Sequence, residues 1–331
     1  MTTDHEPLVS AVIIFKDEER FLNEAVASVV AQSYRSWELV LVDDGSTDAS
    51  TEVARQWAAS HRPQIRYVEH PGHANRGMSA ARNLGLRSTS GELVAFLDAD
   101  DVWLPGKLER QVADLLHHPT AAFTYGPLLR WWRWNGVPSD AGNEDLMGVG
   151  RRRRGPHPLA GTVARPPTLA RLMLRDDYFI PGGALFRREA IQAVGGYDDE
   201  FPGLYEDAVV LMKLCLRFPV HISSYVSYLY RMHDQSCTHR NRSETMVDTA
   251  RRAYLERIDQ YLVNEGLWTP ELGRAVARAA RTSVGRRRRR QRLAGIGRRT
   301  ARSVVPRPIR SLLRRLRPVD RHLIAVVDTG S

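Results

Sequence analysis

The stretch GELVAFLDADDVWLPGKLERQ, residues 91–111, decides the fold. Five uncharged residues, Leu93 to Leu97, are typical of a buried strand, and three carboxylates follow directly: Asp98, Asp100 and Asp101. Like charges this close repel and raise one another's pKa unless solvent or a cation screens them. The stretch therefore predicts a strand that ends either in a solvated acidic turn or in a metal site.

Similar strands recur before this one and alternate with helices. Short runs rich in Val, Ile and Leu predict strands that are buried on both faces, whereas apolar residues at three- and four-residue spacing predict helices. The predicted strands are 9–15, 39–42, 65–68 and 93–97, and the predicted helices are 18–32, 48–60, 79–86 and 105–117. Glu18 and Glu19 suit a first helical turn, and Pro105 suits a first helical position. The alternation predicts an α/β fold with a parallel sheet covered on both sides.

Beyond residue 120 the alternation loosens. We expect further strand at residues 123–136 and a flexible loop or lid at 135–168. Helices are expected at 205–217, 244–263 and 270–282. We expect a main domain at 1–236, a helical C-terminal extension at 237–282 and an arginine-rich tail at 283–331.

The composition excludes some classes of protein. The chain has 331 residues, of which 43% are hydrophobic, which suffices for a sizeable core. It contains no run near the roughly 20 apolar residues of a membrane helix, and its first residues carry acids where a signal peptide carries bases. Cys215 and Cys237 are not spaced as metal ligands. We expect a cytoplasmic protein with reduced thiols.

The positive charge is concentrated at the C-terminus. Residues 281–321 hold 16 arginines and one acid, so their formal charge is +15, and the net charge of +10 leaves −5 for the rest. Arginines interleaved with Leu, Ile and Val predict a segment, 283–317, that lies on an anionic membrane surface. The protein would then be peripheral on the inner face of the plasma membrane. A disordered tail and nucleic-acid binding are the alternatives, and the acidic body disfavours nucleic acid.

Polar residues follow several of the predicted strands. Asp17 comes after the first, Asp44 after the second, and Asp98 and Asp100 after the fourth. Ligands bind at the carboxyl ends of the strands in such sheets, so these side chains are expected at one edge. Two carboxylates in a D-x-D pattern can hold Mg²⁺ or Mn²⁺ when a diphosphate supplies further oxygens. Each motif taken alone is also consistent with a capped turn that binds nothing.

Six motifs in order resemble those of family 2 glycosyltransferases with the GT-A fold. They are residues 9–50, then GMSAARNLGL, GELVAFLDADDVWLPGKLE, GGYDDEF, GLYEDAVVLMKL and YRMHDQS, within residues 8–236. The resemblance implies a GT-A-like nucleotide-sugar-binding sheet, an inverting sugar transfer from a nucleoside-diphosphate donor (UDP-, GDP- or dTDP-linked), and a divalent metal that bridges the diphosphate.

The resemblance also implies roles for individual residues. Phe15 and Asp17 would lie near the nucleoside and Asp44 on the base. Asp98 would lie near the ribose or sugar, and Asp100 on the metal. Arg82 would face the diphosphate, and Asp207 would be the catalytic base.

Further roles follow from the residue types. One carboxylate suffices to deprotonate an acceptor hydroxyl when a metal stabilises the leaving diphosphate, which agrees with Asp207. Glu206 is either a substrate contact or a helix cap. His233 is a candidate metal ligand beside Asp98 and Asp100, or a structural histidine, and the forked donors of Arg231 suit a diphosphate.

The remaining expectations concern aromatic and histidine residues and the wider role. Trp131, Trp132 and Trp134 are expected in the core rather than on a sugar, and His70 and His73 in a mobile loop. The acceptor would be a sugar or a lipid-linked molecule, in cell-surface polysaccharide or glycolipid synthesis. A nucleotidyltransferase remains an alternative, but it should show a Gly-rich loop after the first strand, where this chain has FKDEER.

Overall fold

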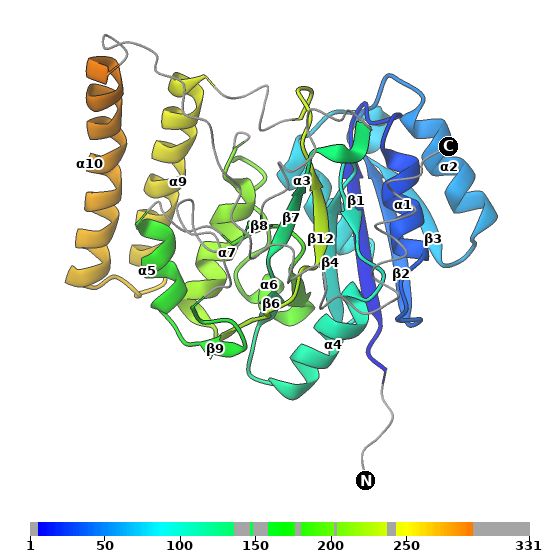
Figure 1. The fold of residues 1–331 in the computed structure, drawn as a ribbon, viewed down its shortest axis with the longest axis horizontal. Helices are drawn as coiled ribbons and strands as arrows, with labels where there is room; N and C mark the ends of the chain where they lie inside the picture. The colour runs from blue at the N-terminus through cyan, green and yellow to red at the C-terminus, as the bar shows by residue number, and fades with distance from the viewer. Residues whose placement is uncertain are drawn as a thin grey trace.

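A computed structural model describes residues 6–135, 146–147, 158–175, 180–201, 204–236 and 243–293. Within these residues the centre is an eight-stranded sheet in the order β3-β2-β1-β4-β10-β6-β11-β9 (Figure 1). The strands are β1 (Val9–Phe15), β2 (Trp37–Asp43), β3 (Ile65–Glu69), β4 (Leu93–Asp98), β6 (Phe123–Tyr125), β9 (Thr162–Ala164), β10 (Leu185–Arg187) and β11 (Val220–Ile222). The first four run parallel, and β10 is antiparallel to both of its neighbours.

A smaller sheet carries the part of the chain that follows the acidic stretch. Its order is β5-β12-β7-β8, with β5 (Val102–Trp103), β7 (Leu128–Trp131), β8 (Leu146–Met147) and β12 (Tyr228–Arg231). Leu229 in β12 pairs with Val102 in β5 and with Leu129 in β7. The C-terminal end of the predicted main domain is thereby brought beside the acidic stretch.

Helices cover both faces of the large sheet, and the last two stand at one edge of the molecule. They are α1 (Leu22–Val30), α2 (Ser50–Ser60), α3 (Met78–Arg87), α4 (Lys107–His117), α5 (Thr168–Leu174), α6 (Arg188–Ala193), α7 (Glu206–Arg217), α9 (Glu244–Asn264) and α10 (Pro270–Leu293), with short 3-10 turns η1 (Pro71–His73) and η2 (Arg133–Asn135).

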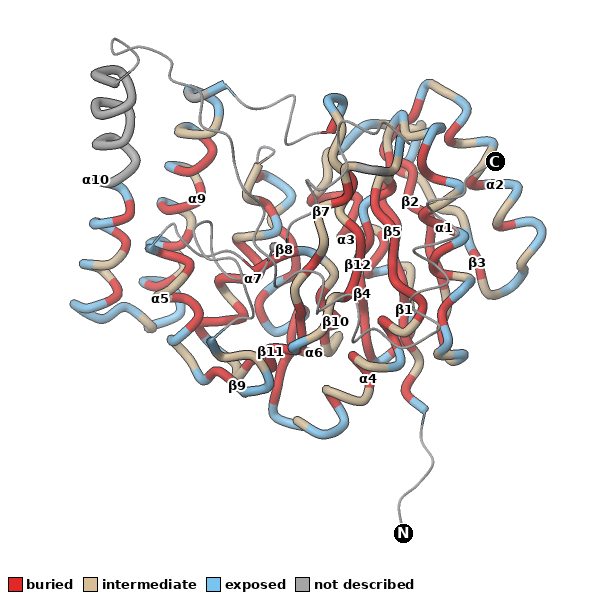
Figure 2. Tube along the Cα trace, in the orientation of Figure 1, coloured by how far each residue is buried: buried red, intermediate tan, exposed pale blue. Residues whose placement is uncertain are grey.

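Alternate residues of β1 point into two separate cores, because successive side chains of a strand face opposite ways. Ile13 packs with Leu22 of α1 and Leu108 of α4, whereas Val12 packs with Ala81 of α3 and Leu214 of α7. Figure 2 shows the strands as a continuous buried centre. The prediction of a parallel sheet covered on both sides is confirmed for β1 to β4.

One helix begins later than predicted. The helix expected from residue 18 begins at Leu22, and the acid in its first turn is Glu24. The N–H groups of Glu18 and Glu19 donate instead to the side chains of Ser50 and Asp48. These contacts with a distant loop hold residues 18–19 outside the helix, so their placement in its first turn was wrong.

The position predicted for Pro105 was also wrong. Helix α4 begins at Lys107 with Gly106 as its N-cap. The carbonyl oxygen of Pro105 accepts the N–H of Ser33, 2.9 Å away, so this residue joins the end of α1 to the start of α4.

The two predicted C-terminal helices are confirmed as α9 and α10, which stand side by side at one edge of the molecule (Figure 1). Leu255 and Ile258 of α9 and Val276 of α10 belong to the same hydrophobic cluster as α5 and α7. The extension therefore shares a core with the sheet. Most of the predicted loop at 135–168, and residues 294–331 of the tail, lie outside the described residues. Among the helices that are described, none is both long and apolar enough to cross a bilayer.

Candidate active site

The carboxyl ends of three neighbouring strands bring the predicted acids together. Phe15 pairs with Asp43, and Ile14 pairs with Asp98, so β1, β2 and β4 end at the same level. A cavity of about 210 Å³ opens there. It is lined by Ile14, Phe15, Lys16, Glu18, Asp44, Met78, Ala81, Asp98, Ala99, Asp100, Tyr230 and Ser236.

Asp44 is held from outside its own strand. Its two carboxylate oxygens accept the backbone N–H groups of Arg76 and Gly77, at 2.7 and 2.9 Å. The residue is buried, yet it lines the cavity. Because each carboxylate oxygen can accept more than one hydrogen bond, Asp44 keeps acceptor capacity for a ligand.

Asp100 and His233 form the pair that suits a cation best. His233 Nε2 lies 3.0 Å from Asp100 Oδ2, and the imidazole is buried against the ring of Phe21. A carboxylate and an imidazole at this spacing fit a divalent ion, which would replace their mutual hydrogen bond. Asp98, expected as a third ligand, binds Arg82 through Oδ1, and 51% of its side chain is exposed. Among the described residues, Asp98, Asp100 and His233 do not form a group whose potential ligand atoms all lie close enough together to hold one ion.

The third acid of the triplet has a structural position. Asp101 is buried, and its Oδ1 accepts the backbone N–H of Arg231 at 2.8 Å. Burial raises the pKa of Asp101, and the charges of Asp100 and Asp98 add to this effect. Asp101 therefore ties the acidic turn to β12.

Arg231 occupies a different place from the one expected. Only 3% of the residue is exposed, and its guanidinium donates to Glu24 and to the carbonyl oxygen of Asp100. The rings of Trp131 and Phe21 lie 4.5 and 4.7 Å from its guanidinium carbon. This geometry does not support direct contact with a diphosphate, because the guanidinium is buried and two of its nitrogens donate to these partners. Arg231 instead holds the Asp100 turn from behind.

Arg82 joins two segments of the site. Its Nη2 lies 2.7 Å from Asp98 at the end of β4, and its Nη1 lies 2.6 Å from Glu206 at the start of α7. Burial alone would lower the pKa of Arg82, but the charges of Asp98 and Glu206 outweigh burial and raise it. Burial raises the pKa of Glu206, and Asp207 adds to this while Arg82 opposes it. Glu206 is buried as the partner of Arg82.

Asp207 lies in the first turn of α7 and is exposed. Its Oδ1 accepts the N–H of Ala208 at 2.7 Å. The residue before the helix, Tyr205, has a left-handed backbone with φ of 78° and stacks on Tyr254. Such a conformation costs free energy in a residue other than glycine and is typical of functional sites. It sets where α7 begins and hence where Asp207 points.

A second cavity, of about 60 Å³, adjoins the first at Asp98. Asp207, Arg82 and Asp98 line it, and Gly182, Gly183 and Tyr228 form part of the wall. Asp44 and Asp100 therefore share one cavity, Asp207 lines the next, and Asp98 belongs to both.

Asp17 does not line either cavity. Its Oδ1 accepts the N–H of Thr47 at 2.6 Å, and Lys16 binds its Oδ2. The hydrogen bond from Lys16, followed by the one from the Thr47 N–H, lowers the pKa of Asp17 to about 2. Asp17 thus connects the end of β1 to the turn after β2, beside the predicted nucleoside site rather than in it.

Sequence reasoning missed some supporting residues. Trp131 is in the core as expected, but its contact with Arg231 was not foreseen. His73 was expected in a mobile loop, whereas both of its ring nitrogens have close partners in the structure. Arg231 and Ser46 are more than twenty positions away from Trp131 and His73, and Glu69 lies across a turn from His73. Local patterns in the sequence therefore do not predict these contacts.

Solved structures share this architecture at low sequence identity. The fragment 1–349 of S. aureus TarS, in complex with UDP-GlcNAc, matches with a TM-score of 0.57 and 17% identity over 76% of this chain and 66% of that one. The mannosyltransferase PcManGT from Pyrobaculum calidifontis, in complex with GDP-Man and Mn²⁺, matches with a TM-score of 0.53 and 18% identity. This match covers 98% of this chain and 85% of PcManGT. The fold is that of the GT-A glycosyltransferases.

The sequence gives the family. Residues 10–195 match the family model described as Glycosyl transferase family 2, and the chain belongs to this family. It is 38% identical over 112 residues to the putative glycosyltransferase EpsE of Bacillus subtilis, which covers 34% of this chain and 40% of EpsE. It is 34% identical over 119 residues to the Escherichia coli glucosyltransferase WfgD, whose full name includes GlcNAc-diphosphoundecaprenol. This match covers 36% of this chain and 45% of WfgD. The matches span less than half of these relatives.

Proposed function

We propose that this protein transfers a sugar, with inversion, from a nucleoside-diphosphate sugar to a hydroxyl group of an acceptor. The observation that carries the proposal is the position of Asp98, which lines both the cavity of Asp44 and Asp100 and the cavity of Asp207. A donor in the first cavity would place its sugar at Asp98, where an acceptor in the second cavity could reach it. Family membership supports the same reaction class.

Asp207 is the proposed general base. It is exposed in the second cavity and can take the proton of the acceptor hydroxyl as that oxygen bonds to the anomeric carbon. The bond between the anomeric carbon and the diphosphate oxygen breaks on the opposite side, which inverts the configuration. Arg82 binds Asp98 and Glu206 and so fixes the start of α7 relative to the end of β4.

Asp100 and His233 are the proposed holders of Mg²⁺ or Mn²⁺, with Asp98 beside them. When bound, the ion would stabilise the negative charge on the leaving nucleoside diphosphate. The Mn²⁺ of the mannosyltransferase PcManGT supports a divalent ion in this fold. Arg231 contributes by holding the carbonyl oxygen of Asp100, at 2.7 Å.

Asp44 and Phe15 are proposed to bind the nucleobase of a UDP-, GDP- or dTDP-linked donor. The TarS and PcManGT complexes contain UDP-GlcNAc and GDP-Man, which supports this donor class. The name of WfgD supports a lipid-linked acceptor and a role in cell-surface polysaccharide or glycolipid synthesis. Such an acceptor would agree with a cytoplasmic protein that is peripheral on the inner face of the plasma membrane, through residues 283–317. We retain the division at residues 236 and 282 as part of this proposal.

A donor screen tests the proposal. The full chain is incubated with Mn²⁺, a panel of nucleotide sugars and a lipid-linked or free sugar acceptor, and release of nucleoside diphosphate is measured. We expect acceptor-dependent release with one nucleotide and its loss in Asp100→Ala. A screen without any release would contradict the transferase, and full activity of Asp100→Ala would contradict the metal site.

A further inference from the structure

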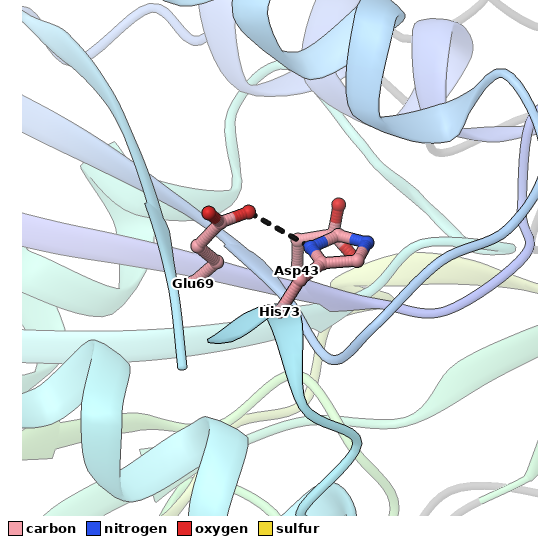
Figure 3. A group of neighbouring side chains, drawn as sticks. All are labelled: Asp43, Glu69 and His73. Carbon is pink, nitrogen blue, oxygen red and sulfur yellow. Dashed lines mark hydrogen bonds and ion pairs between the residues drawn. The ribbon is translucent and has the colours of Figure 1, made fainter. Parts of the chain in front are cut away.

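His73 connects two loops at the edge of the nucleotide cavity. It ends the short turn η1, and Figure 3 shows its ring directed at Glu69. Its Nδ1 lies 2.8 Å from Glu69 Oε2, and its Nε2 lies 2.8 Å from the carbonyl oxygen of Ser46. One histidine thus joins the end of β3 to the turn that follows Asp44.

Both partners of the ring are hydrogen-bond acceptors, so each nitrogen must carry a proton to make its bond. A neutral imidazole has only one N–H, whereas the imidazolium has two. The bond to Ser46 and then the bond to Glu69 raise the pKa of His73 above its usual value. The geometry therefore favours a charged His73.

The two loops meet where Asp44 is held. A side-chain carbon added to Gly45 would lie 2.9 Å from the nitrogen of Asn75 and 3.0 Å from the carbonyl oxygen of His73, so the loops are in direct contact. The N–H groups that bind the Asp44 carboxylate, those of Arg76 and Gly77, follow His73 in the same loop. Loss of the contact with Ser46 would free this loop to move relative to Asp44.

We propose that His73 is a positioning residue whose imidazolium fastens the 70–77 loop to the 44–48 turn and so orients Asp44 toward the nucleobase of the donor. The proposal rests on the function proposed above and extends it to a residue outside the cavity. Donor binding should be strongest while His73 is protonated, and should weaken as the pH rises through its pKa. The contribution is complete below about pH 6.5, the usual pKa of histidine, and is lost as the pH rises through the raised pKa of His73.

A bound metal ion is the alternative to a protonated His73. One potential metal-ligating atom from each of Asp43, Glu69 and His73, a carboxylate oxygen or an imidazole nitrogen, lies within 4.8 Å of the others. However, the oxygens of Asp43 already accept the Ser46 N–H at 2.8 Å and the Thr51 hydroxyl at 2.6 Å. Tyr67 donates to Glu69 as well. An ion would have to displace these bonds, so the observed arrangement favours the imidazolium.

Several charged or titratable groups lie on the elements around His73. They come from β2, the turn after it, α2, β3 and the 70–77 loop: Asp43, Asp44, Arg55, Tyr67, Glu69 and His70. Arg55 lies 3.6 Å from Glu69 and opposes a positive charge on His73, whereas Glu69 and Asp43 favour it.

Binding of UDP and of GDP, measured by calorimetry at constant Mn²⁺ between about pH 5.5 and 8.5, tests the proposal. We expect the affinity of the wild-type protein to fall over this pH range by about three- to tenfold more than the affinity of His73→Gln. At low pH the variant should bind more weakly than wild type, and its affinity should depend less on pH. The diphosphate itself titrates in the same way with both proteins. The readout is therefore the difference between the pH dependence of affinity in wild type and in His73→Gln. His117→Gln, at an exposed position of α4, is the matched control and should follow wild type. In the donor assay, the KM of His73→Gln should rise while kcat at saturation stays close to wild type.

Two further measurements separate the possible failures. If wild type binds nucleoside diphosphate but His73→Gln shows the same pH dependence, the role of His73 is overturned while the proposed function stands. The pKa of His73, followed by NMR without any donor, should lie above about 6.5 and fall in Glu69→Gln, and a value at or below 6.5 would overturn the proposal even if no nucleotide binds. Zn²⁺ binding by Asp100→Ala that disappears on adding His73→Gln would show a cation site and would also overturn it.

Discussion

At the scale of the residue, the acids of the site differ in their partners rather than in their chemistry. Asp101 is buried and bonded to the backbone of Arg231, and Asp44 is fixed by two N–H groups. Asp207, in contrast, is exposed, and within the part of the chain that the structure describes its carboxylate accepts only the N–H of Ala208. A base needs a lone pair that can reach the acceptor, so Asp207 is the acid best suited to take a proton.

Replacing Asp207 by Asn tests this role. The amide oxygen can still accept the Ala208 N–H, but the side chain can no longer take a proton. We expect kcat to fall by about 10²- to 10⁴-fold, with donor affinity close to wild type. Steady-state kinetics and calorimetry with nucleoside diphosphate measure the two quantities.

Glu256→Gln, on the exposed side of α9, is the control for removing one negative charge and should keep wild-type kcat. Turnover of Asp207→Asn within a few fold of wild type would show that another group accepts the proton.

At the scale of the element, α3 carries Arg82 into the site and must pack closely on the sheet to do so. The contact is made at Gly85, where an added Cβ would meet Val12 Cγ1 at 2.4 Å and Val42 Cγ2 at 3.2 Å. This glycine is a weak helix former, and its place in the helix is explained by the close approach of β1 and β2.

We predict that Gly85→Ala destabilises the protein, although alanine is the better helix former by about 1 kcal/mol. Overpacking at Val12 should outweigh this gain and lower the free energy of unfolding by about 1–3 kcal/mol. Urea denaturation measures the change. In the same experiment Gln56→Ala, at an exposed position of α2, should stay within about 0.5 kcal/mol of wild type. A Gly85→Ala protein that is more stable than wild type would contradict the close packing of α3.

At the scale of the whole molecule, the charge is divided between the body and the C-terminus. Residues 281–321 have a formal charge of +15, whereas the rest of the chain is slightly acidic. Helix α10 leads into this segment from the shared core, since Leu272, Val276 and Ala279 are buried there. The basic segment therefore begins on an anchored helix, a position that suits docking of the whole enzyme.

We predict that the full chain sediments with vesicles that contain anionic lipid, and that removing residues 281–331 abolishes this binding. Each arginine near an anionic surface contributes about 1 kcal/mol, and salt screens the attraction, so about 0.5 M NaCl should release the protein. Neutral vesicles are the control and should not bind. A truncated protein that still sediments with anionic vesicles would contradict docking through the tail, and a preference of the full chain for RNA over vesicles would favour nucleic acid instead.

Local sequence patterns predicted the elements but not all of their ends. Strand β1 was predicted with its observed bounds, because seven consecutive buried residues leave a clear apolar signal. The start of α1 was missed because Ser50 and Asp48, which lie 32 and 29 positions from the residues they bind, contact the backbone of residues 18–19. Arg231 was assigned to the diphosphate because its partners Glu24 and Asp100 cannot be seen from residues 228–236 alone.

Apolar periodicity and strand-end motifs are local properties of the chain, so the sequence alone defines the class of fold, the family and the set of acids at the strand ends. Burial and hydrogen bonding depend on residues that are distant in sequence, so only the folded chain shows which of these acids keep a free lone pair. Asp98 and Asp101 are three positions apart, yet Asp98 lies half exposed between two cavities, whereas Asp101 is buried in the wall of the second one.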